Sequence, residues 1–390
     1  MTIDVARARA ETPGCREVLH LNNAGAALMP APVLEAQIAH LELEGRIGGY
    51  EAAAEAETWI EGTYDAVARL LNCAREDVAL VENATVAWDM AFHAFRFAPG
   101  DRVLTAEAEY VSNYIAYLKA ARHHGIEVEA IPSDESGQLS LAALESMIDD
   151  RVKLISITHL PTNGGLVNPA EGVGRIARAA GIPYLLDACQ SAGQMALDVE
   201  KLGCDLLSAT GRKYLRGPRG SGFLYVRRAI LEQIEPPFLD LRSAEWTAPE
   251  EYRMRPDARR FENWEFNYAA VIGLGVAVEY TLGWGLEAIE QRVTALAEQL
   301  RARLSALPGV TVHDLGARRS GIVSFGHDRL DAEAIKRALG EQRINVSVTD
   351  VKSTRLDMER RRLGDLVRAS AHYYNTEDEL ARFTEALAAL

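Results

Sequence analysis

The stretch VKLISITHLPTNGGLVNPAEGVGRIARAAGIPYLLDA, residues 152–188, places a strand, a helix and a second strand one after another. Residues 152–160 and 182–188 are apolar runs of strand length. Between them, GVGRIARAAG (172–181) has helical periodicity and ends at a glycine, a common helix terminator. The pattern predicts a βαβ unit, in which a helix connects two parallel strands.

The same alternation extends on both sides of this unit. Further strands are predicted at 101–107, 126–132, 204–210 and 220–226. Strands that alternate with helices of 10 to 15 residues indicate the α/β class, with a large, mostly parallel sheet covered on both faces. Ligands of such sheets bind outside the carboxyl ends of the strands, so polar residues that follow the strands are expected to converge there.

The C-terminal third has a different pattern. A helical stretch covers about 268–307 and has a possible break at LGWG, residues 282–285. Short strand-like and helical segments follow and predict a smaller α+β domain. We therefore expect an N-terminal segment (1–20) that packs on the small domain, a large domain (21–265) and a small domain (266–390). Residues 235–267 are predicted to be a long irregular connection, and loops of that length are often functional.

Composition excludes several classes of function. The chain has 390 residues, of which 48% are hydrophobic and 25% charged, as expected for a globular protein with a large core. Its net charge of −14 argues against non-specific binding to nucleic acid or anionic membranes. No apolar run of about 18 residues predicts a membrane span, and the N-terminus lacks the apolar core of a signal peptide. The four scattered cysteines predict reduced thiols in a cytoplasmic protein, without a metal site.

Two polar residues at neighbouring strand ends suggest a specific chemistry. Asp187 ends the strand at 182–188, and Lys213 follows the next strand within GRKYLRGPRG (211–220). Alone, Asp187 could equally be a helix cap or a turn residue. Together, the two are what pyridoxal phosphate requires, because a lysine binds its aldehyde and a carboxylate keeps its pyridine nitrogen protonated.

The segment ENATVAWDMAF (82–92) has the features of a phosphate site. Asn83, Ala84 and Thr85 fall at the predicted start of a helix, where backbone N–H groups and the helix dipole favour an anion. Thr210 and Arg212 add a hydroxyl and a positive charge from the lysine side.

These motifs resemble the class V, fold-type I family of pyridoxal phosphate enzymes, which includes cysteine desulfurases, selenocysteine lyases and isopenicillin N epimerase-like proteins. The resemblance covers almost the whole chain and is carried by LHLNNAGAALMP (19–30), residues 160–193, GRKYLRGPRGSGFLYV (211–226), RFENWEFN (260–267) and VRASAHYYNTEDEL (367–380). It implies a large sheet domain of the seven-stranded type, a smaller C-terminal α+β domain, pyridoxal 5′-phosphate as cofactor, and a homodimer with sites near the subunit interface.

The resemblance also implies roles for individual residues. Lys213 is the Schiff-base lysine and proton shuttle, and Asp187 pairs with the pyridine nitrogen. Gln190 and Thr162 lie near the phenolic oxygen of the cofactor. The phosphate is held by Thr85, Thr210, Arg212 and the amide of Ala84. Arg368 binds the carboxylate of an amino-acid substrate, and Asn23 and Tyr50 are further predicted substrate contacts, Tyr50 because it follows the flexible GRIGG.

Three departures from the family pattern bear on the reaction. Tyr110 occupies the position of a histidine that family members stack on the cofactor, and a tyrosine is a poor base at neutral pH, so Lys213 or Tyr110 itself must do more. The mobile cysteine of the desulfurases is absent from 315–322 and 368–379, and Cys189 is expected to be a packing residue. NWE (263–265) replaces a Gly-Thr pair that binds phosphate of the neighbouring subunit, so that contact is open.

Residues 42–57, 108–113 and 211–220 look closest to hercynylcysteine sulfoxide lyase-like and isopenicillin N epimerase-like proteins. We therefore expect a C–S lyase that acts by β-elimination on a cysteine-derived amino acid or its sulfoxide. The alternatives are an epimerase, an aminotransferase, or a catalytically degenerate member with a regulatory role. The sequence does not decide which step follows removal of the substrate Cα proton, nor which side chain the substrate carries.

Overall fold

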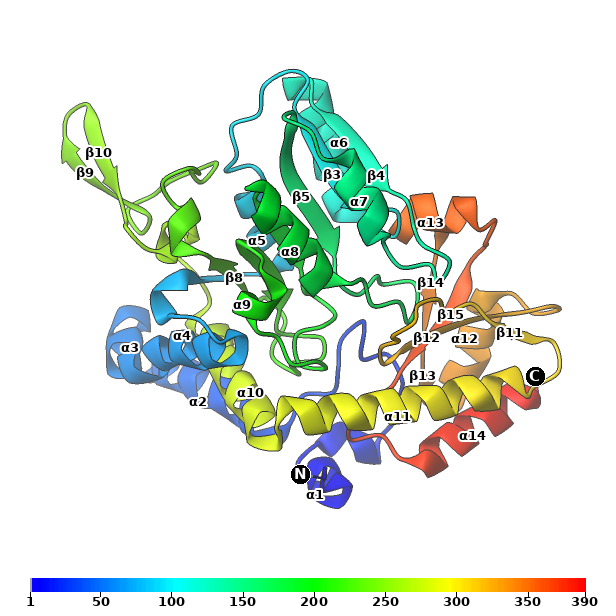
Figure 1. The fold of residues 1–390 in the computed structure, drawn as a ribbon. Helices are drawn as coiled ribbons and strands as arrows, with labels where there is room; N and C mark the ends of the chain where they lie inside the picture. Colours follow the sequence, from blue (N-terminus) through cyan, green and yellow to red (C-terminus); the bar gives the residue numbers. More distant parts are fainter. Residues whose placement is uncertain (1) are drawn as a thin grey trace.

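The computed structural model describes residues 2–390, and its core is a seven-stranded sheet (Figure 1). The strands have the order β2-β8-β7-β6-β5-β3-β4. The strands β3 to β7 run parallel, whereas β8 is antiparallel to both of its neighbours. The predicted α/β class with a large, mostly parallel sheet is confirmed. The bounds are β2 Val78–Val81, β3 Arg102–Ala106, β4 Glu127–Ile131, β5 Val152–Thr158, β6 Tyr184–Asp187, β7 Leu206–Thr210 and β8 Gly222–Val226.

Helices cover both faces of this sheet, which is why its strands are apolar throughout. Leu185 of β6 belongs to the core that includes helices α5 and α6, whereas the next residue, Leu186, belongs to the core that includes α8. Successive strand residues thus face opposite layers. The helices of these two layers are α5 Ala84–Phe92, α6 Val111–His124, α7 Leu141–Met147, α8 Ala170–Ala180 and α9 Val199–Leu202.

Helices α2, α3 and α4, which precede the sheet in the chain, and α10, which follows it, form a separate layer. α10 packs against α2 and α4, and α3 connects these two. The break predicted near 282–285 is confirmed, because α10 and α11 meet at Gly285, which has a positive φ of 85°, and their axes differ by 80°. Within residues 2–390, no single helix is long and apolar enough to cross a membrane; only the bent pair α10 and α11, taken together, meets the length and composition criteria. The bounds are α2 Ala31–Ile47, α3 Gly49–Glu55, α4 Glu57–Leu71, α10 Tyr268–Trp284 and α11 Leu286–Ser305.

The C-terminal domain contains a four-stranded antiparallel sheet of order β11-β12-β15-β14. The N-terminal strand β1 pairs in parallel with β13, which links the start of the chain to this domain. Because α10 packs on helices of the large domain, we propose a domain boundary at Gly285 instead of 266. The bounds are α1 Val5–Ala10, β1 Leu19–His20, β11 Val310–Val312, β12 Ile322–His327, α12 Ala332–Glu341, β13 Ile344–Asn345, β14 Ser347–Thr349, α13 Arg355–Arg360, β15 Leu366–Ser370 and α14 Glu377–Ala388.

The connection over 235–267 is more regular than predicted. It contains a hairpin of β9 (Ala244–Ala248) and β10 (Glu251–Met254) that projects from the body of the molecule (Figure 1). Its aromatic side chains face solvent, since Trp246 is 79% exposed. A hairpin with both faces in solvent lacks the apolar alternation by which half-buried strands are found in a sequence.

The turn that follows β6 requires a glycine at position 193. Gly193 has φ 92°, and a Cβ there would lie 2.4 Å from the backbone carbon of Tyr214, next to Lys213. We predict that Gly193→Ala lowers the free energy of unfolding by about 2 kcal/mol or more, from backbone strain and overpacking combined. Gly181→Ala is the control, because Gly181 also has a positive φ but faces open space, so only the strain of about 1 kcal/mol is expected. Urea denaturation measures both; equal losses would contradict the steric argument.

Candidate active site

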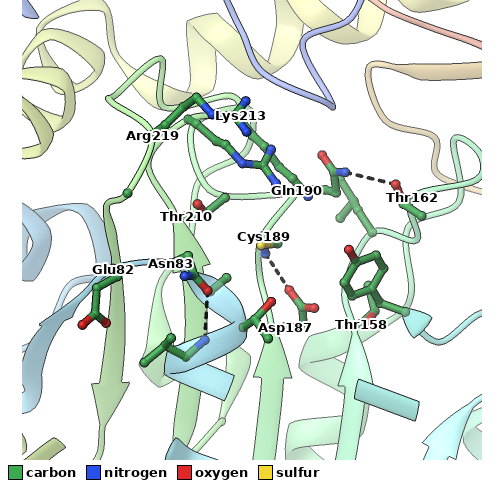
Figure 2. Close-up of a pocket in the computed structure, with 17 residues that line it drawn as sticks. Glu82, Asn83, Thr158, Thr162, Asp187, Cys189, Gln190, Thr210, Lys213 and Arg219 are labelled. Atoms are coloured by element: carbon green, nitrogen blue, oxygen red, sulfur yellow. Dashed lines mark hydrogen bonds between the residues drawn. The ribbon is translucent and has the colours of Figure 1, made fainter. Parts of the chain in front are cut away.

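A cavity of about 530 Å³ opens at the carboxyl ends of the parallel strands (Figure 2). Its walls come from the β2–α5 junction and from the segments that follow β5, β6 and β7, as expected for an open α/β sheet. The structure brings together at this cavity all nine residues predicted to bind the cofactor, namely Ala84, Thr85, Tyr110, Thr162, Asp187, Gln190, Thr210, Arg212 and Lys213.

Lys213 is held in a tight turn directly after β7. The backbone N–H of Arg216 donates to the Lys213 carbonyl at 2.9 Å, and Arg216 has a φ of 60°. The Lys213 side chain is buried in the cavity wall, and this burial lowers the pKa of its amine. The adjacent Arg212 lowers the pKa of Lys213 further, whereas Cys189 and Asp187 act in the opposite direction. A lowered pKa increases the share of neutral amine, which is the nucleophilic form.

Asp187, the last residue of β6, is fixed in orientation by two donors. Its Oδ1 accepts the backbone N–H of Cys189 at 2.9 Å, which is one of the dashed lines in Figure 2, and its Oδ2 accepts Nδ2 of Asn113 at 3.0 Å. The carboxylate is buried and lines the same cavity as Lys213. A buried carboxylate with a fixed orientation is the partner that a protonated ring nitrogen needs.

The N-terminus of α5 forms one end of the cavity. Asn83 caps this helix by accepting the N–H of Val86 at 3.0 Å, and the amides of Ala84 and Thr85 lie in the first turn, where helical N–H groups lack intrahelical partners. This end of the cavity therefore suits an anion such as phosphate.

The lysine side adds cationic and hydroxyl groups to this anion site. Arg212 and Arg219 line the cavity, and the guanidinium of Arg212 donates to the carbonyl of Gly25. Thr210 donates its hydroxyl to the Ser221 carbonyl at 3.2 Å. Glu82 also lines the cavity, and its Oε1 accepts Nδ2 of Asn263 at 3.4 Å.

Gln190 and Thr162 form the opposite wall. Nε2 of Gln190 donates to the carbonyl of Ala24 at 3.1 Å and reaches Oγ1 of Thr162 at 3.5 Å. Oε1 of Gln190 is buried and has no hydrogen-bond partner among the described residues. A buried acceptor without a partner is costly, so the wall fits a ligand that carries a hydrogen-bond donor.

Arg368 of β15 connects the small domain to the cavity through Thr162. Its guanidinium donates to the Thr162 carbonyl at 3.1 Å and to the Thr162 hydroxyl at 2.5 Å. Burial lowers the pKa of Arg368 to about 10, so it remains a cation at neutral pH. Its Nη2 reaches Oδ1 of Asn22 at 3.5 Å, and among residues 2–390 it forms no ion pair and its Nε has no hydrogen-bond partner. An uncompensated buried cation favours binding of an anionic group.

None of the three predicted substrate contacts lines the cavity itself: Arg368 touches its wall through Thr162, and Asn23 and Tyr50 lie further away. Asn23 is fully buried, where it donates to the carbonyl of Ser370 at 2.7 Å and accepts the hydroxyl of Tyr374 at 2.5 Å. Tyr50 is 67% exposed and lines a separate surface hollow with Phe266. The roles predicted for Asn23 and Tyr50 stay predictions.

Sequence reasoning missed part of the cavity and its support. Thr158 and Arg219 line the wall, and Asn113 holds Asp187 from behind. A signal for Asn113 was available, because it lies in the first turn of the helix that follows β3, close to the strand end where polar residues are expected to converge. In the part of the chain that the structure describes, no group of three or more His, Cys, Asp or Glu side chains could hold a metal ion.

Comparison with known proteins gives consistent matches over nearly the full length. The family model of the class-V aminotransferases matches residues 19–383. A probable cysteine desulfurase of Methanothermobacter thermautotrophicus is 28% identical over 390 residues, which cover 97% of this chain and 96% of that protein.

Two solved proteins are similar in both sequence and fold. The cysteine desulfurase of Thermococcus onnurineus NA1 is 27% identical with a TM-score of 0.92, and the alignment covers 100% of this chain and 98% of that one. The cystine C–S lyase C-DES, solved with its reaction product cysteine persulfide, is 26% identical with a TM-score of 0.87 and coverage of 97% and 99%. A variant of C-DES has glycine covalently linked to its pyridoxal phosphate cofactor.

Covalent attachment of the cofactor at Lys213 can be tested directly. We predict that Lys213→Ala, reconstituted with pyridoxal phosphate, lacks the visible absorption band of the lysine-bound cofactor, because the buried amine is gone. Lys201→Ala is the control, since Lys201 is exposed on α9, and it should keep the full band. Survival of the band in Lys213→Ala would show that another amine is used.

Proposed function

The chain belongs to the class-V aminotransferase family, and from this premise we propose that it is a C–S lyase that acts by β-elimination on a cysteine-derived amino acid or its sulfoxide. The predicted family resemblance and the predicted cofactor, pyridoxal phosphate, are confirmed, and the chain is a pyridoxal phosphate-dependent lyase. The observation that carries the proposed reaction is one cavity that contains the buried Lys213 amine and the oriented Asp187 carboxylate. Arg368 is hydrogen-bonded to Thr162 of its wall.

The residues of the cavity fit this cofactor. When bound, pyridoxal phosphate supplies an aldehyde that joins an amino group and a protonated ring that accepts the electron pair left on the substrate Cα. Asp187 would hold the proton on the ring nitrogen. The first turn of α5, with Thr85, would hold the phosphate together with Arg212, and the unpartnered Oε1 of Gln190 would accept a hydrogen bond on the opposite wall.

Arg368 is proposed to bind the substrate carboxylate. A guanidinium presents paired N–H donors that match a carboxylate, and here burial makes the pairing stronger. Because Thr162 already accepts two hydrogen bonds from Arg368, the guanidinium is held in place before the substrate arrives. The substrate is therefore expected to be an amino acid with a free α-carboxylate.

Lys213 is proposed to act as the base. Its Nζ takes the proton from Cα, the Cβ–S bond breaks, and a double bond forms between Cα and Cβ. The proton held by Nζ passes to the leaving sulfur, which departs as a thiol, from cystine as a persulfide, or from a sulfoxide as a sulfenic acid. The released enamine is hydrolysed to pyruvate and ammonia, so no external oxidant or reductant is needed.

The cysteines favour release of the sulfur over its transfer to the enzyme. Cys189 lines the cavity, but burial raises the pKa of its thiol to about 12, so it is not a thiolate at neutral pH. A sulfur-accepting cysteine must be a thiolate. Burial likewise raises the pKa of Cys15 and Cys73, and neither lines the cavity. All four cysteines are free thiols, which supports the proposed cytoplasmic location.

The reaction is tested by product analysis. We predict that the holoenzyme forms pyruvate from cystine, S-substituted cysteines or cysteine sulfoxides. Cys189→Ala should retain activity within about threefold, because no covalent step uses this thiol. Formation of alanine from cysteine, abolished in Cys189→Ala, would contradict elimination and favour a desulfurase. Accumulation of the amino form of the cofactor with an oxoacid would indicate transamination, and deuterium entering Cα without a product would indicate epimerisation.

We further propose that the chain forms a homodimer through α2. Leu34, Ile38 and Leu41 repeat at helical spacing along one exposed face of this helix, and Leu41 also lines a surface hollow with the exposed Tyr50. Stable contacts between copies commonly bury such apolar faces.

The dimer predicts a mass of twice 42.7 kDa in light scattering at micromolar concentration. We expect the double substitution Leu34→Glu and Leu41→Glu to shift the protein to monomer, because it places charges in the apolar contact. Ile115→Glu is the control, as Ile115 is equally exposed but lies on α6. A monomeric unsubstituted protein would overturn the proposal.

A further inference from the structure

A second carboxylate, Glu109, lies buried behind Asp187 in a position that the reaction described above does not use. Glu109 lies between β3 and α6 and is 3% exposed. Its two oxygens accept hydrogen bonds from the hydroxyl of Thr105 at 2.9 Å, the N–H of Tyr110 at 2.8 Å, the N–H of Thr158 at 3.0 Å, the hydroxyl of Thr158, and Nδ2 of Asn113 at 2.9 Å. So many converging donors indicate a site built for a negative charge.

Asn113 joins this carboxylate to Asp187. Its amide nitrogen donates to Oε1 of Glu109 at 2.9 Å and to Oδ2 of Asp187 at 3.0 Å, so one amide group bridges two carboxylates. An amide NH₂ has two hydrogens, and both are used here. The bridge removes the freedom of Asp187 to rotate, since its Oδ1 is already held by the Cys189 N–H.

The pKa of Glu109 lies near neutral pH. Burial raises the pKa of Glu109 to about 7, and the charge of Asp187 raises it, while the hydrogen bonds lower it. The other titratable groups that face it are Tyr117 on α6 and Tyr184 on β6, and burial raises the pKa of both, so they stay neutral. β3 and β5 present only the hydroxyls of Thr105 and Thr158 and the Thr158 N–H to it.

We propose that Glu109 is a positioning residue for the cofactor, acting through Asn113 to hold Asp187 in place and to keep a second negative charge behind the ring nitrogen. This inference rests on the proposed function, because it requires Asp187 to pair with that nitrogen. The effect follows from electrostatics, since a negative charge at short range in a buried site stabilises a nearby proton. A merely structural Glu109 would anchor the start of α6 and leave the ring nitrogen unaffected.

The experiment uses holoenzyme reconstituted with pyridoxal phosphate that carries ¹⁵N in the ring, and follows the ring-nitrogen resonance by NMR as the pH is raised. In Glu109→Gln and Asn113→Leu, we expect the ring nitrogen to lose its proton at a pH lower by about one unit or more, a tenfold change in the equilibrium constant. Glu109→Gln removes the charge directly. Asn113→Leu removes the donor that lets both carboxylates ionise together, so Glu109 takes up a proton.

Asn375→Leu is the matched control. Asn375 is also buried, and its amide donates to Glu379, four residues away, at 2.9 Å, but it does not line the cavity. We expect it to lower the melting temperature without moving the ring-nitrogen titration. A ring-nitrogen titration in Glu109→Gln and Asn113→Leu that matches the control would overturn the proposal.

The unsubstituted enzyme provides a test that does not depend on variant folding. Its ring-nitrogen resonance should shift as Glu109 gains a proton below about pH 7, and a flat response between about pH 5.5 and 8.5 would also overturn the proposal. Failure of the proposed function is distinguishable, because the unsubstituted protein would then bind no cofactor, or would bind it and form no pyruvate.

Discussion

The site depends on burying unlike charges at one edge of a parallel sheet. Lys213 and Asp187 follow or end neighbouring strands, so the register between β6 and β7 fixes them relative to each other. Burial alone destabilises each charge. The hydrogen bonds that Asp187 receives from Asn113 and Cys189 compensate for that cost at the carboxylate, and burial lowers the pKa of the Lys213 amine. Burial destabilises the charged forms of Lys213 and Asp187. By lowering the pKa of the Lys213 amine, it also makes this amine more nucleophilic.

Much of the fold was predictable because the parallel strands are buried on both faces. Such strands appear as continuous apolar runs, and the run at 182–188 identified both β6 and the carboxylate at its end. Strand ends in this class of fold meet at one edge, which is why residues that follow the strands, such as Thr162, Gln190 and Lys213, could be expected at one cavity. β2 was missed because a four-residue apolar run after a helix has no distinctive period.

What could not be predicted depends on contacts between residues far apart in the chain. The bridge from Asn113 to Asp187 spans 74 positions, and the contact of Arg368 with Thr162 spans 206. Periodicity carries no information on such pairs. Tyr50 was predicted as a substrate contact from the glycine-rich stretch before it, and in the single chain it lines a surface hollow separate from the cavity. Local flexibility does not indicate where a side chain points.

The segment before β15 bears on the proposed choice between release of the sulfur and its transfer to the enzyme. Asp350 caps the turn at 351–354 by accepting the N–H of Ser353 at 3.0 Å, and its carbonyl accepts Nδ2 of Asn163 at 3.1 Å. Arg361, just after α13, donates to the carbonyl of His313. These contacts tie the segment to both domains, as expected of a fixed wall and not of a mobile arm. Together with the raised pKa of the Cys189 thiol and the buried Arg368 beside Thr162, this fixed segment is the physical basis on which we propose elimination for this chain.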